Sequence, residues 1–229
     1  MQYTAVITGG SKGIGLALTE KFLIEGFNVV CISRSQGETE RLQEMHGDRL
    51  LCLFADLSVK SEIIKVGEEI KSRYKTIDVL VNNAGRFFPG SVSEEEDGVF
   101  EMQMALNVGS AYHLTRNLLP ILKGRSSYIF NICSTASIVP YINGGSYCIS
   151  KHALLGFSKV LREEMKTVGV RVSSVLPGAT LTDSWSEVDL PESRFIRTTD
   201  IASAIWFAWL VRENTVMEEI LLRPIEGDI

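Results

Sequence analysis

The chain carries, directly after its first apolar run, the stretch Thr8-Gly9-Gly10-Ser11-Lys12-Gly13-Ile14-Gly15, and a helical pattern begins at the next residue, Leu16. The glycines allow a tight turn, a close approach of the backbone to a pyrophosphate, and close packing of a helix on a strand. The helix N-terminus offers N–H donors to that anion. A glycine pattern alone also fits an ordinary strand-to-helix turn, but the strand before it and the helix after it favour a dinucleotide-binding turn.

The rest of the chain repeats this alternation of strand and helix. Runs rich in Val, Ile and Leu predict strands at Tyr3–Thr8, Asn28–Ile32, Leu50–Phe54, Asp78–Val81, Ser127–Ile132, Val170–Leu176 and Glu219–Leu222. Segments of helical period predict helices at Gly13–Glu25, Glu38–Met45, Val59–Tyr74, Gly98–Leu122, Tyr147–Thr167 and Thr199–Val211. Because parallel strands need crossover connections, this order predicts an α/β fold: a doubly wound, Rossmann-like parallel seven-stranded sheet with helices on both faces.

The length of 229 residues allows one large domain or two small ones. No linker, composition shift or fixed-period repeat divides the chain, so we expect residues 1–229 to form a single NAD(P)-binding domain. The segment Gly178–Thr198 has no clear periodicity and is a candidate lid or binding loop. The acidic stretch Glu94–Asp97 is interpreted as a solvated helix start, with an acidic binding patch as the alternative.

Composition excludes several classes of protein. The chain is 45% hydrophobic and 22% charged, which is typical of a soluble globular protein, and its net charge of −5 disfavours nucleic-acid binding. The apolar run Ile201–Val211 is too short to span a bilayer, and the first residues lack the pattern of a secretory signal. The 4 cysteines form no C-x-x-C pair and the 3 histidines share no ligand spacing. We therefore expect a cytoplasmic protein with reduced thiols, no metal site, and no membrane or nucleic-acid partner.

The end of the second predicted strand indicates which dinucleotide binds. A carboxylate at this position would bind the adenosine ribose of NAD, but the sequence there is Cys31-Ile32-Ser33-Arg34-Ser35, with no Asp or Glu before Glu38. Arg34 and Lys12 are both placed to pair with a ribose phosphate, which favours NADP(H) over NAD(H). Two solvated surface cations are the alternative interpretation.

Tyr147 and Lys151 lie four residues apart in a predicted helix and therefore project from one face. We expect the ammonium to favour the ionised phenol and to lower its pKa from about 10 toward neutrality. Tyr147 would then donate a proton to the alkoxide that develops during carbonyl reduction. Ser134, just past the fifth predicted strand, would hydrogen-bond the same oxygen. For Tyr147 alone, a half-buried structural tyrosine is the alternative.

With these residues and several further motifs, essentially the whole chain resembles the short-chain dehydrogenase/reductase family. The motifs are the Thr8–Gly15 turn, Asp56-Leu57 after the third strand, Asn82–Gly85 after the fourth, Asn107, the set Ser134, Tyr147 and Lys151, and Pro177-Gly178 after the sixth strand. A Tyr-x-x-x-Lys pair arises often by chance, so the ordered combination carries the resemblance. It implies an oxidoreductase that reduces a ketone or aldehyde to an alcohol, or the reverse, by hydride transfer with Tyr147 as acid/base.

The resemblance also implies roles for individual residues. The implied catalytic residues are Asn107, Ser134, Tyr147 and Lys151. The implied cofactor-binding residues are Gly9, Ser11, Lys12, Gly13, Ile14, Gly15, Arg34, Asp56, Leu57, Asn83, Ala84, Gly85, Tyr147, Lys151, Pro177, Gly178, Thr180 and Thr182. In the family, Lys151 binds the nicotinamide ribose hydroxyls and Asn107 helps hold a water that links Lys151 to solvent. Thr180 would contact the nicotinamide through its backbone, and Thr182 would face the carboxamide.

One departure from the family pattern concerns the serine. The family often has Ser-Ser here, whereas this chain has Cys133-Ser134. Ser134 lies 13 residues before Tyr147, as is usual in the family, so the catalytic role goes to Ser134 and not to Ser137. Cys133 and Cys148 are then expected to be small packing residues.

Residues expected to face a substrate are Arg86-Phe87-Phe88, the segment Ser137–Gly145 with Tyr141 and Asn143, and the loop residues Trp185 and Phe195. Their aromatic side chains favour a partly apolar pocket for a small-molecule carbonyl or alcohol. Arg125, Arg194 and Arg197 are candidates to attract a carboxylate or an acidic carrier, with solvated surface arginines as the more economical interpretation.

Several functions stay open at this point. Within the reductases, 3-oxoacyl-carrier-protein reductase is the alternative, although the ending Glu219–Pro224 looks more like the branch near sepiapterin and hydroxy-acid reductases. A non-catalytic NADP-sensing protein is the alternative of another class, and epimerisation or dehydration would use the same fold. The predicted helix Gly98–Leu122 is apolar around much of its circumference, and in the family this helix and the Tyr-bearing helix form a dimer interface, so we expect a homodimer or homotetramer.

Overall fold

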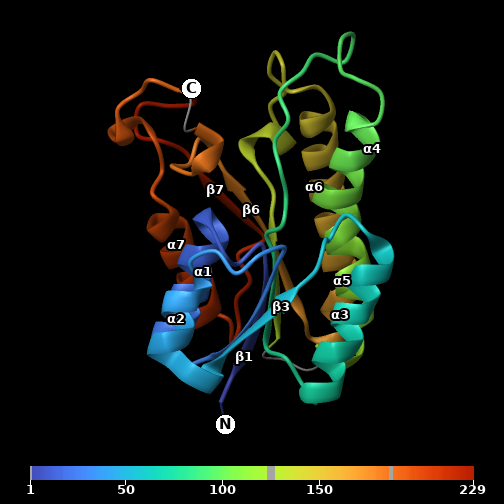
Figure 1. Ribbon diagram of the computed structural model, residues 1–229, viewed down its shortest axis with the longest axis vertical. Coiled ribbons are helices and arrows are strands. Elements are labelled where there is room, and N and C mark those ends of the chain that lie inside the picture. The colour runs from blue at the N-terminus through green and yellow to red at the C-terminus, as the bar shows by residue number, and fades with distance from the viewer. Residues whose placement is uncertain (1, 123–126, 186–187) are drawn as a thin grey trace.

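A computed structural model of the protein describes residues 2–122, 127–185 and 188–229 (Figure 1). Within these residues, seven parallel strands form one sheet in the order β3-β2-β1-β4-β5-β6-β7. The strands are β1 (Thr4–Thr8), β2 (Asn28–Ser33), β3 (Leu50–Phe54), β4 (Val79–Asn82), β5 (Tyr128–Ile132), β6 (Arg171–Pro177) and β7 (Glu219–Leu222). Strand order reverses between β1 and β4, and the carboxyl ends on either side of such a reversal are where open α/β sheets bind ligands.

Helices cover both faces of the sheet. One face carries α1 (Gly13–Ile24), α2 (Thr39–His46) and α7 (Thr198–Leu210), and the other carries α3 (Lys60–Arg73), α4 (Val99–Met104), α5 (Ser110–Leu118) and α6 (Gly145–Met165), as Figure 1 shows. The predicted doubly wound α/β fold is thus confirmed. Across the described segments, the structure contains no helix long and apolar enough to cross a membrane.

The main departure from the predicted elements is the helix expected over Gly98–Leu122. It is divided into α4, a π-helical turn (Ala105–Gly109), α5 and a 3-10 turn (Leu119–Ile121). The π turn contains Asn107, whose side chain bonds to a neighbouring loop, and Pro120 lacks the N–H that would continue an α-helix. The other predicted boundaries agree with the structure to within two residues. The loop Gly178–Thr198 contains short 3-10 turns at Asp183–Trp185 and Glu192–Arg194.

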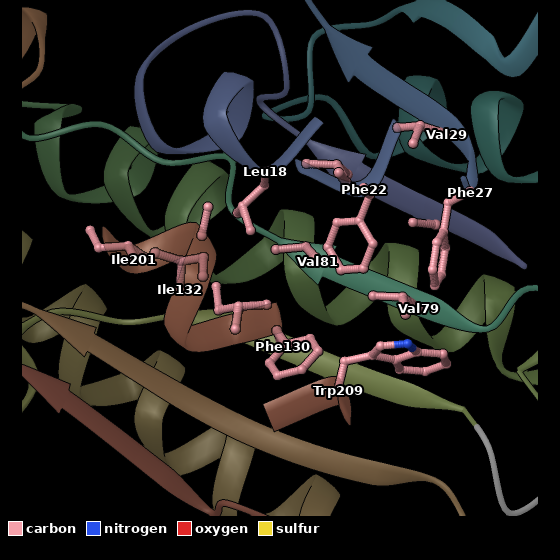
Figure 2. Close-up of a cluster of buried hydrophobic side chains, with 14 of the residues drawn as sticks. Leu18, Phe22, Phe27, Val29, Val79, Val81, Phe130, Ile132, Ile201 and Trp209 are labelled. Atoms are coloured by element: carbon pink, nitrogen blue, oxygen red, sulfur yellow. The ribbon is translucent and has the colours of Figure 1, made fainter. Parts of the chain in front are cut away.

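Alternate residues of the central strands point to opposite faces of the sheet and enter separate cores. Ala5 and Ile7 of β1 pack with buried side chains from α1 and α7, whereas Val6 packs with side chains from α3 and α5. Figure 2 shows the first core, in which aromatic rings of helix and strand lie together; its labelled members are Leu18, Phe22, Phe27, Val29, Val79, Val81, Phe130, Ile132, Ile201 and Trp209. Burial on both faces keeps the central strands apolar and leaves polar chemistry to their ends.

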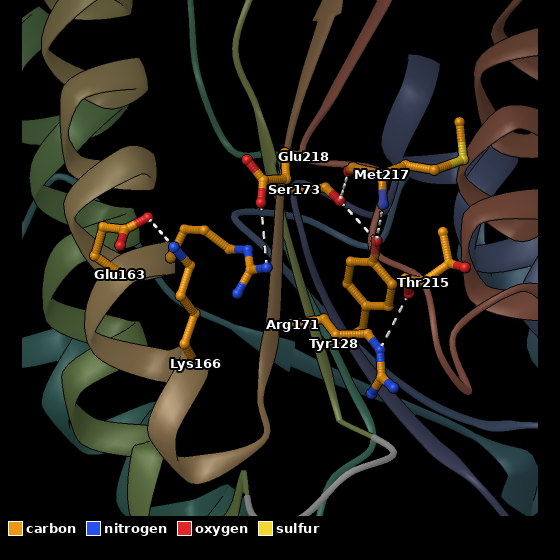
Figure 3. A network of polar contacts seen from close by, with 9 residues as sticks. Tyr128, Glu163, Lys166, Arg171, Ser173, Thr215, Met217 and Glu218 are labelled. Carbon is orange, nitrogen blue, oxygen red and sulfur yellow. Dashed lines mark hydrogen bonds and ion pairs between the residues drawn. The ribbon is translucent and has the colours of Figure 1, made fainter.

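The edge strand β7 is tied to the sheet by polar contacts at its start (Figure 3). The Tyr128 hydroxyl hydrogen-bonds the Ser173 hydroxyl over 2.8 Å and accepts a bond from the Met217 N–H over 3.3 Å. The Ser173 hydroxyl in turn donates to the Met217 carbonyl. Beside them, the Arg171 guanidinium donates to the carbonyls of Glu213 and Thr215. These bonds hold the chain that enters β7 against β5 and β6, and so place Gly178, whose N–H donates to the Leu222 carbonyl.

Candidate active site

The glycine turn connects β1 to α1 and has the backbone that its sequence predicts. Gly9 and Gly13 have φ values of +65° and +52°, which side chains with a Cβ rarely adopt. A Cβ on Gly15 would overlap the Gly9 carbonyl oxygen, so α1 approaches the turn as closely as backbone atoms allow. The turn is therefore a cradle that a Cβ would fill, at a helix N-terminus, and it fits a pyrophosphate.

The loop after β4 fastens this turn. The Thr8 hydroxyl accepts bonds from the N–H groups of Asn83 and Ala84 over 2.8 and 2.9 Å. The Asn83 side-chain amide donates to the Thr8 and Gly9 carbonyls over 2.9 and 3.2 Å. Among the predicted cofactor-binding residues, Asn83 thus contacts the glycine turn directly, and its side-chain amide holds the backbone of Thr8 and Gly9 in place.

The predicted phosphate-binding cations lie on two loops that touch. The Glu38 N–H donates to the Ser11 carbonyl over 3.4 Å, and a Cβ on Gly37 would meet that carbonyl at 2.9 Å. Arg34 precedes this contact and is exposed, while Lys12 follows Ser11. The Lys12 ammonium lies 3.4 Å from the Asp183 carboxylate, and both side chains are largely exposed. Asp183 belongs to the loop after β6, a partner that the sequence did not predict for Lys12.

The segments after β3 and β6 complete the surroundings of the turn. The Asp56 carboxylate accepts bonds from the Ser58 hydroxyl and N–H, which lower its pKa, and the positive charge of Arg34 lowers it further. Leu57 is buried in the second core. After β6, Thr180 donates through its hydroxyl to the Gly178 carbonyl, and the Thr182 methyl group lies 3.2 Å from where a Gly13 Cβ would stand. The predicted segments 8–15 and 177–182 are therefore in contact.

Tyr147 and Lys151 lie in the first two turns of α6. The Lys151 ammonium donates to the Ile132 carbonyl over 2.9 Å and lies 5.7 Å from the centre of the Tyr147 ring. Burial lowers the pKa of Lys151 to about 8. Burial also raises the pKa of Tyr147 to about 12, although its hydrogen bond with the Ser134 hydroxyl acts in the opposite direction.

The expectation that Lys151 moves the Tyr147 phenol toward neutrality is therefore wrong for this structure. Loss of hydration raises the pKa of the phenol, and the lysine that was expected to counter it is itself buried and points to a backbone carbonyl. A phenol with a raised pKa keeps its proton at neutral pH. A protonated phenol at this place is able to donate a proton.

Ser134 is held so that its hydroxyl meets Tyr147. Its hydroxyl accepts a bond from the Ala136 N–H over 3.1 Å, and its own N–H donates to the Ser137 hydroxyl over 3.2 Å. Ser137 thus binds the backbone N–H of Ser134, and the Ser134 hydroxyl is the one that hydrogen-bonds Tyr147. Cys133 and Cys148 are free and buried, as expected of packing residues.

Asn107 binds the loop that follows the Asn83–Gly85 motif. Its carbonyl oxygen accepts from the Arg86 N–H over 2.8 Å, and its amide donates to the Arg86 carbonyl over 3.1 Å and to the Ser150 hydroxyl over 2.9 Å. A Cβ on Gly85 would lie 3.1 Å from Asn107 and 3.6 Å from the Lys151 ammonium. Asn107 therefore brings the β4 loop against α6, directly beside Lys151.

Aromatic side chains lie near the Tyr147 phenol. The ring of Phe87 lies edge to face with Tyr147, with centres 4.9 Å apart, and its centre is 6.4 Å from that of Tyr141. Trp185 and Phe195 pair with each other at 5.4 Å. The predicted arginines are engaged elsewhere: Arg194 pairs with Glu226 and Arg197 with Asp200, whereas Arg125 lies outside the described residues.

The acidic stretch Glu94–Asp97 contains a residue whose position the sequence did not reveal. Glu95 is not a solvated side chain at a helix start; its carboxylate accepts bonds from the Ser146 N–H and hydroxyl at the beginning of α6. The glycines at positions 90 and 145 make room for its side chain, and their lack of a Cβ is a sequence feature that fits this close approach. In the described part of the chain, no three His, Cys, Asp or Glu side chains are grouped so as to hold a metal.

Comparisons with known proteins show the family to which the chain belongs. The family model for short chain dehydrogenases matches residues 3–193. The sepiapterin reductase of Chlorobaculum tepidum is 32% identical over 241 residues, covering 100% of this chain and 99% of that protein. The 3-oxoacyl-[acyl-carrier-protein] reductase FabG of Haemophilus influenzae is 30% identical, covering 89% of this chain and 88% of that protein.

Solved structures show the same likeness. The L-sorbose reductase of Gluconobacter frateurii, complexed with NADPH and L-sorbose, superposes with a TM-score of 0.88 at 28% identity, covering 97% of this chain and 95% of the other. Fold, motif order and sequence similarity over nearly the whole length therefore agree. The chain is an oxidoreductase that belongs to the short-chain dehydrogenase/reductase family.

Proposed function

We propose that residues 1–229 act as one NADP(H)-dependent domain that reduces a ketone or aldehyde to an alcohol, or catalyses the reverse. The observation that carries this proposal is the contact of Tyr147 with Ser134 beside Lys151, next to a glycine cradle. A protein that only senses a dinucleotide would not need a half-buried phenol and a serine hydroxyl that hydrogen-bond each other. This favours an enzyme over the binding-protein alternative.

The cofactor would be held by the turn and the segments around it. The glycine turn with Ser11 and Ile14 would receive the pyrophosphate, Asp56 and Leu57 the adenine end, and the segment Pro177–Thr182 with Ala84 and Gly85 the nicotinamide end. When bound, the cofactor supplies the hydride to the carbonyl carbon or accepts it from the alcohol. Lys151 would bind the ribose hydroxyls of the same group.

The protein would supply the proton. Tyr147, with its pKa raised to about 12, holds a proton at neutral pH and would donate it to the carbonyl oxygen. The Ser134 hydroxyl would donate a second hydrogen bond to that oxygen and fix its position. Asn107 lies in the π turn, close to Lys151 of α6, and would hold a water through which the proton is replaced from solvent.

Two cations support the choice of NADP(H). Arg34 and Lys12 flank the contact between Ser11 and Gly37, and no carboxylate occupies the end of β2. A phosphate on the adenosine ribose would meet both charges. The solved L-sorbose reductase structure contains NADPH, which agrees with the proposal.

The residues around Tyr147 bear on the class of substrate. The rings of Phe87 and Tyr141 lie near Tyr147, and two of the three arginines considered for an acidic carrier, Arg194 and Arg197, pair with acidic residues of the chain. These contacts favour a small carbonyl compound over a carrier-bound one. The full-length similarity to a sepiapterin reductase supports a planar carbonyl compound such as sepiapterin as the second, more specific candidate.

A panel of carbonyl compounds with NADPH and with NADH, monitored by nicotinamide absorbance, tests the proposal. Sepiapterin, simple ketones and aldehydes, and a 3-oxoacyl thioester belong in the panel, and Tyr147→Phe gives the blank. We expect turnover with NADPH that Tyr147→Phe abolishes. Absence of turnover with every compound would contradict the proposal, and product analysis separates reduction from epimerisation or dehydration.

We also propose a homodimer or homotetramer. The helices α4, α5 and α6 cover the same face of the sheet (Figure 1), and each carries exposed apolar side chains: Phe100, Met102, Tyr112, Ile149 and Val160. Such a surface favours burial against another copy. Light scattering at micromolar concentration should give a mass of at least two chains, and a monomer would contradict this arrangement.

We also propose a cytoplasmic location. The four free cysteines, at positions 31, 52, 133 and 148, fit a reducing compartment.

A further inference from the structure

Glu95 joins two segments that meet beside the proposed proton donor. Its carboxylate accepts a 2.8 Å bond from the Ser146 N–H and another bond from the Ser146 hydroxyl. Ser146 immediately precedes Tyr147, and both lie in the first turn of α6. An anionic side chain at this end of a helix binds N–H groups that have no partner within the helix.

The surroundings of Glu95 are built from glycine and a strained turn. A Cβ on Gly90 would meet the Glu95 side chain at 2.7 Å, and one on Gly145 would overlap its carboxylate. The Gly90 N–H donates to the Asn143 carbonyl over 2.9 Å, and Asn143 is the one non-glycine residue among those described with a left-handed backbone, at φ +61°. This conformation is uncommon and needs support from its neighbours.

The other end of the same loop reaches the site. Asn107 binds both backbone groups of Arg86, and the next residue, Phe87, packs its ring against Tyr147. The loop from 86 to 95 is therefore anchored by Asn107 at its start, by the Gly90 bond to Asn143 in its middle and by Glu95 at its end. Between these anchors, it provides the ring that lies on Tyr147.

We propose that Glu95 is a positioning residue: it fixes the loop 86–95 to the first turn of α6 and thereby holds Tyr147 between Phe87 and Ser134. Glu95 touches neither substrate nor cofactor in this role. The expected effect of Glu95 on turnover rests on the proposed function. Its expected effect on the order of the first turn of α6 does not.

The charge of Glu95 matters because Ser146 offers two donors. A carboxylate accepts both at once, whereas an amide at the same place keeps one acceptor oxygen and adds N–H donors that face other donors. Replacement by glutamine should therefore retain part of the contact, and replacement by alanine should remove it. A loose first turn would let the Tyr147 hydroxyl move, and misplacement by about 1 Å lowers a catalysed rate by about 100-fold.

The test compares Glu95→Ala and Glu95→Gln with Glu94→Ala, a neighbouring exposed glutamate, as the matched control. Turnover of the best substrate from the carbonyl panel gives kcat and KM. Fluorescence titration gives the Kd for NADPH, and hydrogen exchange reports on the backbone of residues 144–150. Exchange requires neither turnover nor bound cofactor, so it decides the structural part even if the wild type reduces nothing in the panel.

We expect Glu95→Ala to lower kcat by about 10- to 100-fold and to speed exchange at residues 144–150, with the Kd for NADPH within about twofold of wild type. Glu95→Gln should fall between wild type and Glu95→Ala, and Glu94→Ala should match wild type. Unchanged exchange in Glu95→Ala overturns the proposal. So does a kcat equal to wild type, or an equal effect of Glu94→Ala. If Glu95→Ala does not fold, the same measurements on Glu95→Gln decide.

Discussion

The ammonium of Lys151, a buried residue, donates a hydrogen bond to the backbone carbonyl of Ile132 over 2.9 Å. A carbonyl at the end of β5 is a weak partner for a full charge, and burial accordingly lowers the pKa of Lys151 to about 8. The lysine therefore destabilises the fold in its charged form, although we propose that it binds the cofactor. Functional sites commonly contain such groups.

Replacing Lys151 by methionine should separate these effects. In the unfolded chain a lysine titrates near about 10.4, so the folded protein binds fewer protons between pH 8 and that value, and wild-type stability should rise with pH across this window. Lys151→Met lacks that dependence. We expect its advantage in the free energy of unfolding over wild type to shrink by about 2 kcal/mol between pH 7 and pH 9.5, as measured by urea denaturation, while turnover is lost. If the difference in the free energy of unfolding between the variant and wild type were the same at pH 7 and pH 9.5, the pKa of Lys151 would not be lowered in the folded protein.

Two glycines of this region separate the effect of steric overlap on stability from the effect of backbone strain. Gly15 has no room for a Cβ because the Gly9 carbonyl occupies its place, whereas Gly26, just after α1, has open space but a φ of +88°. Gly15→Ala should lower the free energy of unfolding by at least about 2 kcal/mol and abolish NADPH binding. Gly26→Ala should lower it by about 1 kcal/mol and leave binding intact. Equal losses in the two variants, from thermal denaturation, would contradict the close approach at Gly15.

Features with local signals were predicted from the sequence. Apolar runs predicted the strands, and the Thr8–Gly15 turn predicted where β1 and α1 meet, because backbone conformation there depends on glycine. The π turn at Asn107 was not predicted, because it depends on hydrogen bonds to Arg86, which is 21 residues away in the sequence. The contact of Glu95 with Ser146 spans 51 residues and follows no period. The raised pKa of Tyr147 also escaped, because burial depends on packing around the phenol rather than on its spacing from Lys151.

The ion pair between Lys12 and Asp183 predicts that the loop after β6 competes with the cofactor. The two groups are 3.4 Å apart and largely exposed, so the pair contributes little to stability, but a phosphate that binds Lys12 would be repelled by the nearby carboxylate. We expect Asp183→Asn to tighten NADPH binding by about two- to fivefold at low salt, and the gain to vanish at high salt. Affinity for NADH should not change. Weaker NADPH binding in this variant would mean that Asp183 assists the cofactor instead.

Arg34 provides the sharpest test of the choice between cofactors. It stands at the end of β2, where a carboxylate would bind the ribose of NAD, and its side chain is exposed beside Asp56. Because charge-assisted bonds to a phosphate contribute about 1.5–3 kcal/mol, Arg34→Ala should raise the Kd for NADPH by about 10- to 100-fold and change the Kd for NADH by less than about threefold. Arg41→Ala is the matched control, since Arg41 is an exposed arginine on the adjacent helix that pairs with Glu20. If Arg34→Ala weakens both cofactors equally, or if Arg41→Ala has the same effect, Arg34 contributes only to the general field and does not select NADPH.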